Sequence, residues 1–403
     1  MTNNIAACTI VSLNYLPYAK ILSNSYHKYH PGGRFFVLVV DRKINTLDLS
    51  EEEYEVIFIE DLHLPEFTSI AFKYNILELN TGIKPSFLKF LFCKGVKKLI
   101  YLDPDIQIYK PLDEIFSILD QCEVVLTPHI TCPLPLEKRP REQIFLLSGV
   151  YNLGFIGLRS GDTASRLLDW WEKHCLNLGY LELESGLFVD QKWIGLAPCF
   201  FESVHILKHP GCNMAHWNLH ERNLAWAEGK WMVNGLFPLL FFHFSGIDPS
   251  DTDQISKYQD EYNLTNREDL RELFSSYRLE LKEAGIFDSR FIPYSFGNYS
   301  NGESIAPLAR KIYSIVQDSF SGSDPFDAGG PFYAWARRNR LLMRGGEQSS
   351  DIALPKRQRE SKERFLNQFL RLALRLLGPE RYLRLMKYLS HISNPRNQLD
   401  LFK

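Results

Sequence analysis

The chain has 403 residues, a formal net charge of −2 and 13% aromatic residues, which predicts one large domain or two with a sizeable core and argues against a nucleic-acid-binding protein. No stretch of about 18 residues is apolar enough to span a bilayer, and the first residues lack the pattern of a secretory signal peptide. The seven cysteines are scattered without a Cys-x-x-Cys pair, so we expect reduced thiols and a cytoplasmic location.

The first part of the chain alternates between strand and helix patterns. Strands are expected at residues 6–13, 34–41, 54–59, 97–102 and 123–127, and helices at 18–29 and 87–93. Unbroken apolar runs are typical of strands that are covered on both faces, as in a parallel sheet. The alternation therefore predicts an α/β fold with a mostly parallel sheet flanked by helices.

The strand at 97–102 runs directly into two carboxylates, Asp103 and Asp105, which are separated by Pro104. Residues two apart on extended chain point the same way, so both carboxylates can address one cation. Ligands of open α/β sheets bind beyond such strand ends, and two hard oxygen ligands suit Mg²⁺ or Mn²⁺. The alternative is an ordinary surface turn, where Asp-Pro-Asp is common.

The rest of the chain is less regular. It is expected to contain a loop at 131–141, strands at 151–158 and 238–244, a helix at 164–176 and linkers at 322–325 and 345–355. The pattern becomes more helical and polar after about residue 248. We therefore predict a main α/β domain at 1–250, a helical or irregular extension at 251–345, and a linker with a C-terminal helix at 346–403.

The C-terminal segment differs in charge from the rest. Residues 356–403 contain 12 Lys and Arg but only four Asp and Glu. Apolar residues recur there at helical spacing: Phe365, Leu366, Phe369, Leu370, Leu372, Leu374, Leu376 and Leu377. Such a basic amphipathic helix can lie on an anionic membrane surface. Packing on the domain or on a partner chain is the alternative.

Four segments, taken in order, resemble nucleotide-sugar glycosyltransferases of the GT-A fold, and most closely the family-eight group of glycogenin and bacterial lipopolysaccharide galactosyltransferases. They are the Asp-x-Asp at 103–105, the Asn-x-Gly at 152–154, the Asp-Gln pair at 190–191 and the His-Phe-x-Gly at 243–246. The resemblance spans about residues 5–250. It implies a GT-A type, Rossmann-like sheet, a divalent ion, a UDP-sugar donor and a glycan, lipid-linked or protein acceptor.

The resemblance also implies which residues hold the ion and the nucleotide. Asp105 would chelate the divalent ion, and Asp103 would hold both the ion and the ribose. His243 would be the third protein ligand, which is chemically reasonable because a neutral imidazole suits Mn²⁺ beside carboxylates. Tyr15 sits where the family places an aromatic residue against the nucleotide.

Further roles around the reacting sugar follow from the same resemblance. Asn152 is expected near the donor sugar, and Asp190 and Gln191 by the anomeric carbon and the acceptor. Lys84 or Lys89 would contact the donor phosphate or sugar, and the spacing leaves both open. Retention of the anomeric configuration is implied, although Asp190 would be a general base if the enzyme inverts.

The chain departs from the family after His243. The family continues with Lys-Pro-Trp, whose lysine contacts the diphosphate, whereas this chain has no lysine at 247–249. Lys208 and Arg222 are candidates for the missing cation. Residues 211–219 are rich in amide and aromatic groups, so we expect a loop that faces a sugar, with an ordinary packed loop as the alternative.

Other protein classes fit the sequence less well. A nucleotidylyltransferase would need a glycine-rich loop after the first strand, where residues 12–16 contain no glycine. A phosphohydrolase of the Asp-x-Asp type would need a small residue and Thr after Asp105, where this chain has Ile106 and Gln107. A non-catalytic or partner-dependent sugar-nucleotide-binding protein of the same fold stays open. We expect a cytoplasmic enzyme of cell-surface or lipid-linked glycan synthesis, held peripherally on the inner face of the membrane by its C-terminal helix.

Overall fold

A computed structural model of the chain describes residues 4–44, 52–137, 142–343 and 356–394, together with Leu49 and Asn397. The chain forms two compact units. The first comprises Met1–Pro65 and Ile76–Ser295, and the second comprises Glu66–Asn75 and Phe296–Lys403. The predicted linker at 345–355 and residues 138–141 of the predicted loop lie outside the described residues.

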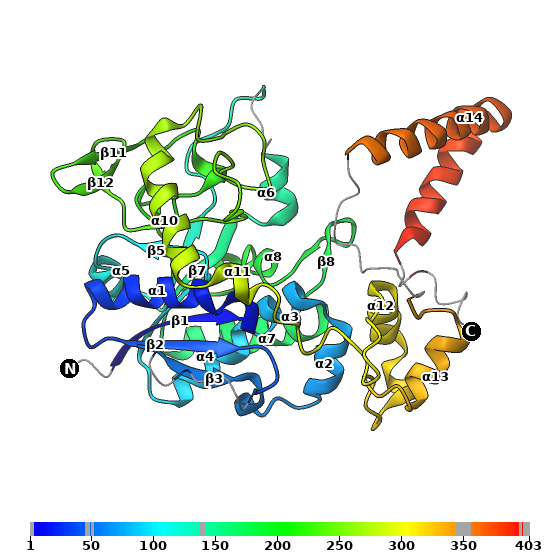
Figure 1. The fold of residues 1–403 in the computed structure, drawn as a ribbon, viewed down its shortest axis with the longest axis horizontal. Helices are drawn as coiled ribbons and strands as arrows, with labels where there is room; N and C mark the ends of the chain where they lie inside the picture. The colour runs from blue at the N-terminus through cyan, green and yellow to red at the C-terminus, as the bar shows by residue number, and fades with distance from the viewer. Residues whose placement is uncertain are drawn as a thin grey trace. The chain divides into compact units, whose positions relative to one another are not determined.

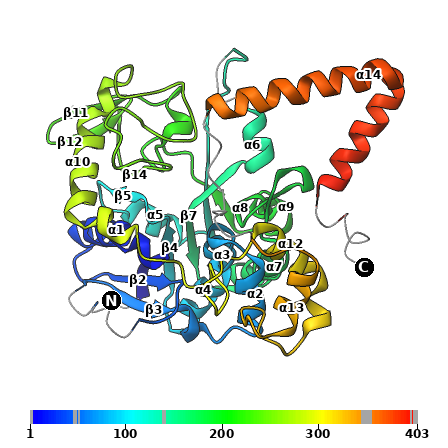
Figure 2. The same cartoon turned by 45° about the vertical axis from the view of Figure 1, so that its right-hand side comes forward.

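A seven-stranded sheet forms the centre of the first unit (Figures 1 and 2), with the strand order β10-β6-β7-β4-β1-β2-β3. The strands are β1 (Ile5–Val11), β2 (Arg34–Val39), β3 (Glu55–Phe58), β4 (Lys98–Leu102), β6 (Val124–Pro128), β7 (Tyr151–Arg159) and β10 (Val204–Ile206). Among them β7 runs antiparallel to both of its neighbours, and the other pairs are parallel. This is the mostly parallel GT-A type of α/β sheet that the sequence predicted.

Helices cover both faces of this sheet. The first unit contains α1 (Leu16–Tyr29), α3 (Ile76–Gly82), α4 (Lys84–Cys93), α5 (Asp113–Ile118), α6 (Gln143–Ser148), α7 (Asp162–Leu178), α8 (Gln191–Ile194), α9 (Ala197–Phe200), α10 (Arg271–Glu283) and α11 (Ile286–Ser289). Successive residues of β1 face opposite layers. Ala7 packs in one core with Leu22 of α1, whereas Cys8 lies on the side of Lys84 in α4.

The predicted strand at 238–244 is divided between two small sheets. β13 (Phe237–Pro238) joins the hairpin of β11 (Leu224–Ala227) and β12 (Lys230–Val233), while β14 (Phe241–His243) pairs antiparallel with β5 (Ile106–Ile108). The division falls at Leu240, whose N–H donates to Gly211 O and whose carbonyl accepts from Tyr109 N. An apolar run shows no such break, so sequence reasoning gave one strand where there are two.

The second unit is built around helix α12. It contains α2 (Phe67–Lys73), α12 (Pro307–Val316), α13 (Pro331–Arg338) and α14 (Lys356–Ser393). The buried Arg310 guanidinium of α12 donates to Phe72 O at 2.7 Å and Tyr74 O at 3.0 Å, which ties the short 66–75 segment to residues far along the chain. Helix α14 is broken at Gly378, where φ is +73°, just before Pro379 (Figure 2). Among the described helices, none combines the length and apolar character needed to cross a membrane.

Candidate active site

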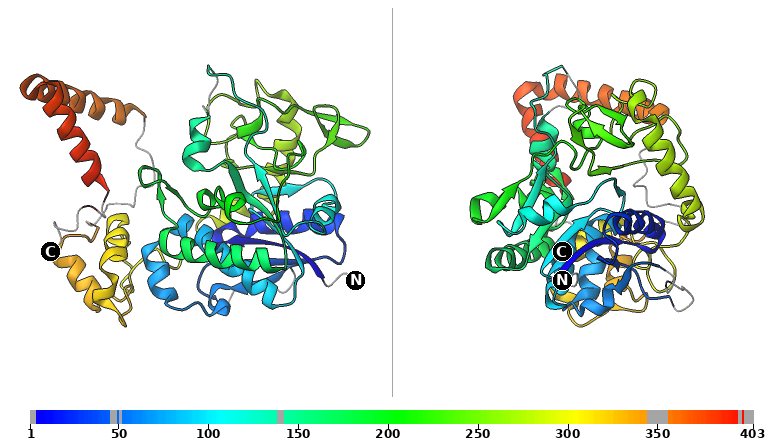
Figure 3. Two further views of the ribbon diagram at one scale, coloured as in Figure 1. Left: turned by 180° about the vertical axis from the view of Figure 1, so that it is seen from behind. Right: turned by 90° about the vertical axis from the view of Figure 1, so that its left-hand side faces the viewer.

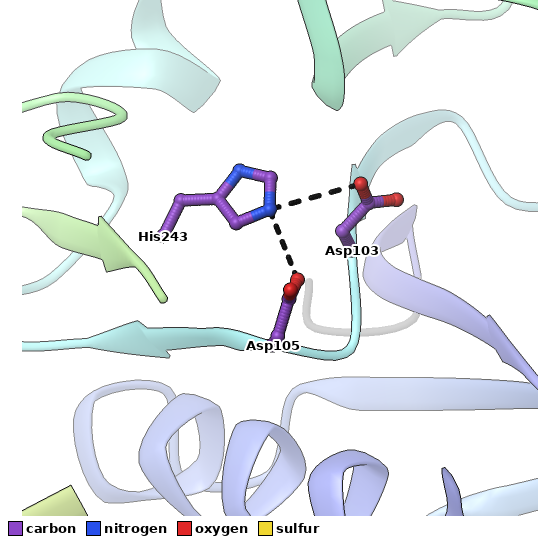
Figure 4. Close-up of side chains that lie close together, drawn as sticks. All are labelled: Asp103, Asp105 and His243. Atoms are coloured by element: carbon purple, nitrogen blue, oxygen red, sulfur yellow. Dashed lines mark ion pairs between the residues drawn. The ribbon is translucent and has the colours of Figure 1, made fainter. Parts of the chain in front are cut away.

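The three predicted metal ligands come together at the carboxyl end of β4. Asp103 and Asp105 follow that strand, and His243 ends β14. His243 Nε2 lies 2.9 Å from Asp105 Oδ1 and 3.9 Å from Asp103 Oδ2 (Figure 4). One potential ligand atom from each of the three residues lies within 4.8 Å of the others. We call these three side chains the metal cluster, after the ion that they could bind. The Phe244 N–H donates to Asp105 O at 2.8 Å, which fixes the two segments to each other.

The chemistry of this cluster fits a hard divalent cation. Two carboxylates and one imidazole form a mixed oxygen and nitrogen donor set of the kind that Mn²⁺ accepts. Burial lowers the pKa of His243, but the charges of Asp105 and Asp103 outweigh burial, so that its pKa is raised overall. The site thus attracts positive charge to the point between the three side chains, where a divalent ion would bind.

Gly154 of β7 leaves the space that His243 occupies. A Cβ atom at this position would lie 2.7 Å from His243 Nδ1 and 2.8 Å from Asn152 Oδ1, closer than van der Waals contact allows. The carbonyl of Gly154 also accepts from Asp103 N at 2.8 Å. The glycine of the Asn-x-Gly segment therefore positions both sides of the metal cluster, a role that sequence reasoning did not assign.

A buried chain of charges links Asp190 to the metal cluster. Lys84 Nζ lies 2.6 Å from Asp190 Oδ2 and 3.9 Å from Asp103 Oδ1, and it donates to Leu153 O at 2.8 Å. Burial lowers the pKa of Lys84, but the two carboxylates outweigh this and raise it, so the amine stays charged. Burial raises the pKa of Asp190, and Lys84 opposes that shift.

Of the two lysines that the sequence left open, Lys84 lies at the site and Lys89 does not. Lys89 forms ion pairs with Asp169 and Glu172 of α7 at 2.8 Å and 2.5 Å. Lys84 is the first residue of α4 and is buried. Tyr101 also contacts the site, because its hydroxyl donates to Asp103 Oδ1 at 2.7 Å.

Amide side chains form a second network beside Asp190. Gln191 Oε1 accepts from Leu153 N at 3.0 Å, and Gln191 Nε2 donates to Ser148 O at 2.9 Å. Asn152 Oδ1 accepts from Gly154 N at 3.1 Å and from Asn213 Nδ2 at 3.0 Å. The predicted residues Asn152, Asp190 and Gln191 therefore do gather near the metal cluster, and all three are buried.

The loop at 211–219 reaches the same place. The Trp217 ring meets the His243 ring edge-on at 5.1 Å between centroids. His216 Nδ1, Trp217 Nε1, Asn213 Oδ1 and His243 Nδ1 are buried without a hydrogen-bond partner among the described residues. Burial lowers the pKa of His216 to about 3, so its imidazole is neutral near pH 7. Polar atoms left in this way are rare in folded proteins.

A cavity of about 410 Å³ opens beside the metal cluster. Asp103, Asp105 and His243 line it, and so does Tyr15, whose ring stacks on Tyr18 at 4.9 Å between centroids. Asn80 and Thr81 of α3 line another part of the wall. Its volume falls in the range of about 300–1,000 Å³ that is usual for small-molecule sites.

The wall of this cavity carries a positively charged side chain at a residue that the sequence did not single out. Lys257 is the only lysine or arginine among the described residues that line the cavity. Its backbone N–H donates to Gly246 O at 2.9 Å. The two candidates from the sequence lie elsewhere: Lys208 is exposed outside the cavity wall, and Arg222 is buried and donates to Pro210 O and Cys212 O. Lys257 stands in an irregular loop without a motif, so no sequence signal marks it.

Comparison with known proteins gives relatives and structural neighbours. No family model matches the chain. Two Bacillus subtilis (strain 168) proteins, both named as uncharacterized, are similar in sequence. YfnF is 25% identical over 269 residues, covering 66% of this chain and 88% of its own. YfnD is 26% identical over 246 residues, covering 59% and 76%.

The solved structures that are similar to the chain include glycosyltransferases. The galactosyltransferase LgtC, in complex with donor and acceptor sugar analogs, is 15% identical, covers 68% of this chain and 95% of its own, and has a TM-score of 0.40. GlyE of Streptococcus pneumoniae TIGR4 is 13% identical, covers 77% and 72%, and has a TM-score of 0.41.

Replacing Gly154 by Ala is expected to weaken Mn²⁺ binding by about 10- to 100-fold, because the new methyl group would displace the His243 imidazole, which we predict to be a ligand. Isothermal titration calorimetry with Mn²⁺ alone would measure this. Gly157→Ala on the same strand is the control, since its Cβ would face Val125 in the core at 3.3 Å. Equal Mn²⁺ affinity in wild type and Gly154→Ala would contradict the assignment of His243 as a ligand.

Proposed function

We propose that this protein is a divalent-metal-dependent glycosyltransferase, which moves a sugar from a nucleoside diphosphate sugar, specifically a UDP-sugar, to a hydroxyl of a glycan, lipid-linked or protein acceptor. The single observation that carries the proposal is the Asp103, Asp105 and His243 cluster on the wall of a cavity at the carboxyl end of β4. The four ordered sequence segments support the same assignment, because all four contribute to this one region.

The cavity gives the donor a defined direction. The stacked Tyr15 and Tyr18 rings offer an aromatic surface for the base, and the carboxylates of Asp103 and Asp105 lie on another part of the same wall. When bound, Mn²⁺ or Mg²⁺ supplies positive charge to the diphosphate as it leaves. We propose that the loop at 211–219 faces the sugar, because Trp217 packs against the His243 ring at the edge of the cavity.

We further propose that transfer retains the anomeric configuration and that Asp190 acts by position. Asp190 is 2% exposed, and its carboxylate is held by Lys84 at 2.6 Å. A carboxylate buried in this way is poorly placed to take a proton from an acceptor hydroxyl that enters the site from solvent. The Lys84 ammonium lies between Asp190 and Asp103 and orients the latter. Gln191 holds the start of β7 through Leu153.

Nucleotide release from UDP-, GDP- and dTDP-sugars tests the reaction class. We expect slow hydrolysis of one donor with Mn²⁺, and a loss of at least about 100-fold with EDTA or in Asp105→Asn, which keeps the side-chain size but removes the charged ligand. Asp260→Asn, at an exposed position, is the matched control. Undiminished, metal-dependent release by Asp105→Asn would refute the site.

The alternative is a non-catalytic sugar-nucleotide-binding protein of the same fold. Calorimetry with the same donors separates the two. Metal-dependent donor binding without release, even when candidate glycan acceptors are added, would favour this alternative over the transferase.

Lys257 is proposed to neutralise the departing diphosphate. We expect Lys257→Ala to lower kcat/KM for the donor by about tenfold, equal to about 1.4 kcal/mol, because one cation is lost from the charge-separating step. Lys257→Arg should keep most of the activity, since it keeps the charge. Lys208→Ala is the matched control, because that lysine is exposed outside the cavity. Unchanged kinetics in Lys257→Ala would reject this role.

The C-terminal helix is proposed to hold the enzyme on the cytoplasmic face of an anionic membrane. Its described part presents large apolar side chains to solvent, including Phe369 (61% exposed), Leu376 (77%) and Leu383 (54%), among many basic residues. Such a helix gains from burying its apolar side chains and from the attraction of anionic lipid.

Vesicle sedimentation tests this anchoring. We expect the full chain to sediment with vesicles that contain phosphatidylglycerol and much less with pure phosphatidylcholine. Leu376→Asp combined with Leu383→Asp should lower the bound fraction at least tenfold, whereas Leu236→Asp, at an exposed position on the first unit, should not. Binding that is unchanged by the paired substitution would exclude the helix as the anchor.

A further inference from the structure

A second cavity, of about 370 Å³, lies on the first unit and shares none of its wall residues with the one described above. Four segments that are distant in sequence form its wall: the end of α1, the residues around β5, the β11–β12 hairpin and the middle of α10. The residues that matter for its chemistry are Trp226, Lys28, Lys110, Gln107 and Glu280. The hairpin projects from the unit in Figures 1 and 3.

The hairpin presents an exposed tryptophan over this cavity. Its two-residue turn has positive φ at Glu228 and Gly229, at +51° and +72°, which matches the twist of the flanking strands. Trp226 and Trp231 are direct cross-strand partners, with ring centroids 5.0 Å apart. Trp231 packs against the core, so it anchors the pair, whereas Trp226 remains 56% exposed. The hairpin therefore holds an aromatic ring in solvent at a fixed place.

Hydrogen-bonding groups on another part of the wall are held in a fixed arrangement. The Tyr109 hydroxyl donates to Gln107 Oε1 at 2.6 Å, and Gln107 Nε2 donates to Glu280 Oε2 at 2.7 Å. Ser276 Oγ donates to Glu280 Oε1 at 3.3 Å. Such a chain fixes the direction in which each amide or carboxylate presents its remaining hydrogen-bonding capacity, which is what recognition of sugar hydroxyls requires.

The charge of the wall is positive. Lys28, Lys110 and Lys230 line the cavity against one carboxylate, Glu280. Lys230 lies 3.9 Å from the exposed Glu228. Lys28 and Lys110, by contrast, form no ion pair with a carboxylate within the part of the chain that the structure describes, and Lys28 lies over the Tyr29 ring at 5.5 Å. Three lysines against one carboxylate leave the wall with a net positive charge, which attracts an anion.

From this combination we propose that the cavity binds an acidic saccharide, that is, a sugar ring carrying carboxylate or phosphate groups. The Trp226 face stacks on the ring, the Gln107 and Glu280 groups bond its hydroxyls, and Lys28 and Lys110 pair with its acidic groups. As part of a glycan acceptor, this saccharide would be held away from the metal cluster. That last step rests on the proposed glycosyltransferase function, whereas binding itself does not.

Calorimetry on the full chain, with tetragalacturonate as the acidic probe and maltotetraose as the neutral one, tests the proposal without any donor. We expect tetragalacturonate to bind and maltotetraose to bind at least tenfold more weakly. Trp226→Ala and the pair Lys28→Glu with Lys110→Glu should each raise the Kd for tetragalacturonate at least tenfold. Phe291→Ala and Lys208→Glu, at exposed positions outside the cavity, are the matched controls and should leave it unchanged.

The outcomes separate this site from the donor site. No binding of tetragalacturonate, equal binding of maltotetraose, binding that survives both variants, or displacement of the saccharide by UDP would each overturn the proposal. Donor hydrolysis by Trp226→Ala should equal that of wild type, because Trp226 does not line the donor cavity. Saccharide binding in a protein that hydrolyses no donor would leave this site standing while the proposed transferase function fails.

Discussion

The antiparallel pairing of β14 with β5 is the interaction on which the whole site depends. Asp105 and His243 are far apart in sequence, and neither belongs to the large sheet. The short ladder places His243 opposite Ile106, one residue after Asp105, and the Phe244 N–H closes onto the Asp105 carbonyl. Because backbone hydrogen bonds set this register, a slip of one residue would turn the imidazole away from both carboxylates.

Charge balance beneath the cluster is the second constraint. Two carboxylates close together repel each other, and Asp190 adds a third negative group nearby. The buried Lys84 ammonium compensates two of these three negative charges, because it lies 2.6 Å from Asp190 and 3.9 Å from Asp103. Removal of Lys84 alone would leave the Asp190 carboxylate as an uncompensated buried charge, which costs about 3–5 kcal/mol in typical cases. The pair therefore serves stability as well as the site.

The sheet and the position of Asp103 and Asp105 at its edge could be predicted because their signals are local, whereas His243 was named only through the resemblance of its segment to a known family. An apolar run that ends on Asp-x-Asp marks both a buried strand and its carboxyl edge. The local sequence could not decide between Lys84 and Lys89, because the decision depends on what each side chain contacts in the folded chain. Five residues on a helix correspond to a rotation of about 140°, so the two lysines face different neighbours. Lys257 could not have been found, since its place follows from a backbone bond in an irregular loop. The Trp226 cavity likewise exists only once four distant segments meet.

The ribosome synthesises the short segment at 66–75 long before the residues against which this segment packs. It belongs to the second unit although the first unit surrounds it in sequence. Its Phe72 ring packs among the aromatic rings of Tyr299, Tyr313, Phe326 and Phe332, which leave the ribosome more than two hundred residues later. Since domains form largely from the N-terminal side during synthesis, Phe72 must spend this interval without its partners. A nascent chain of this protein therefore carries an exposed apolar segment that is covered only near the completion of synthesis.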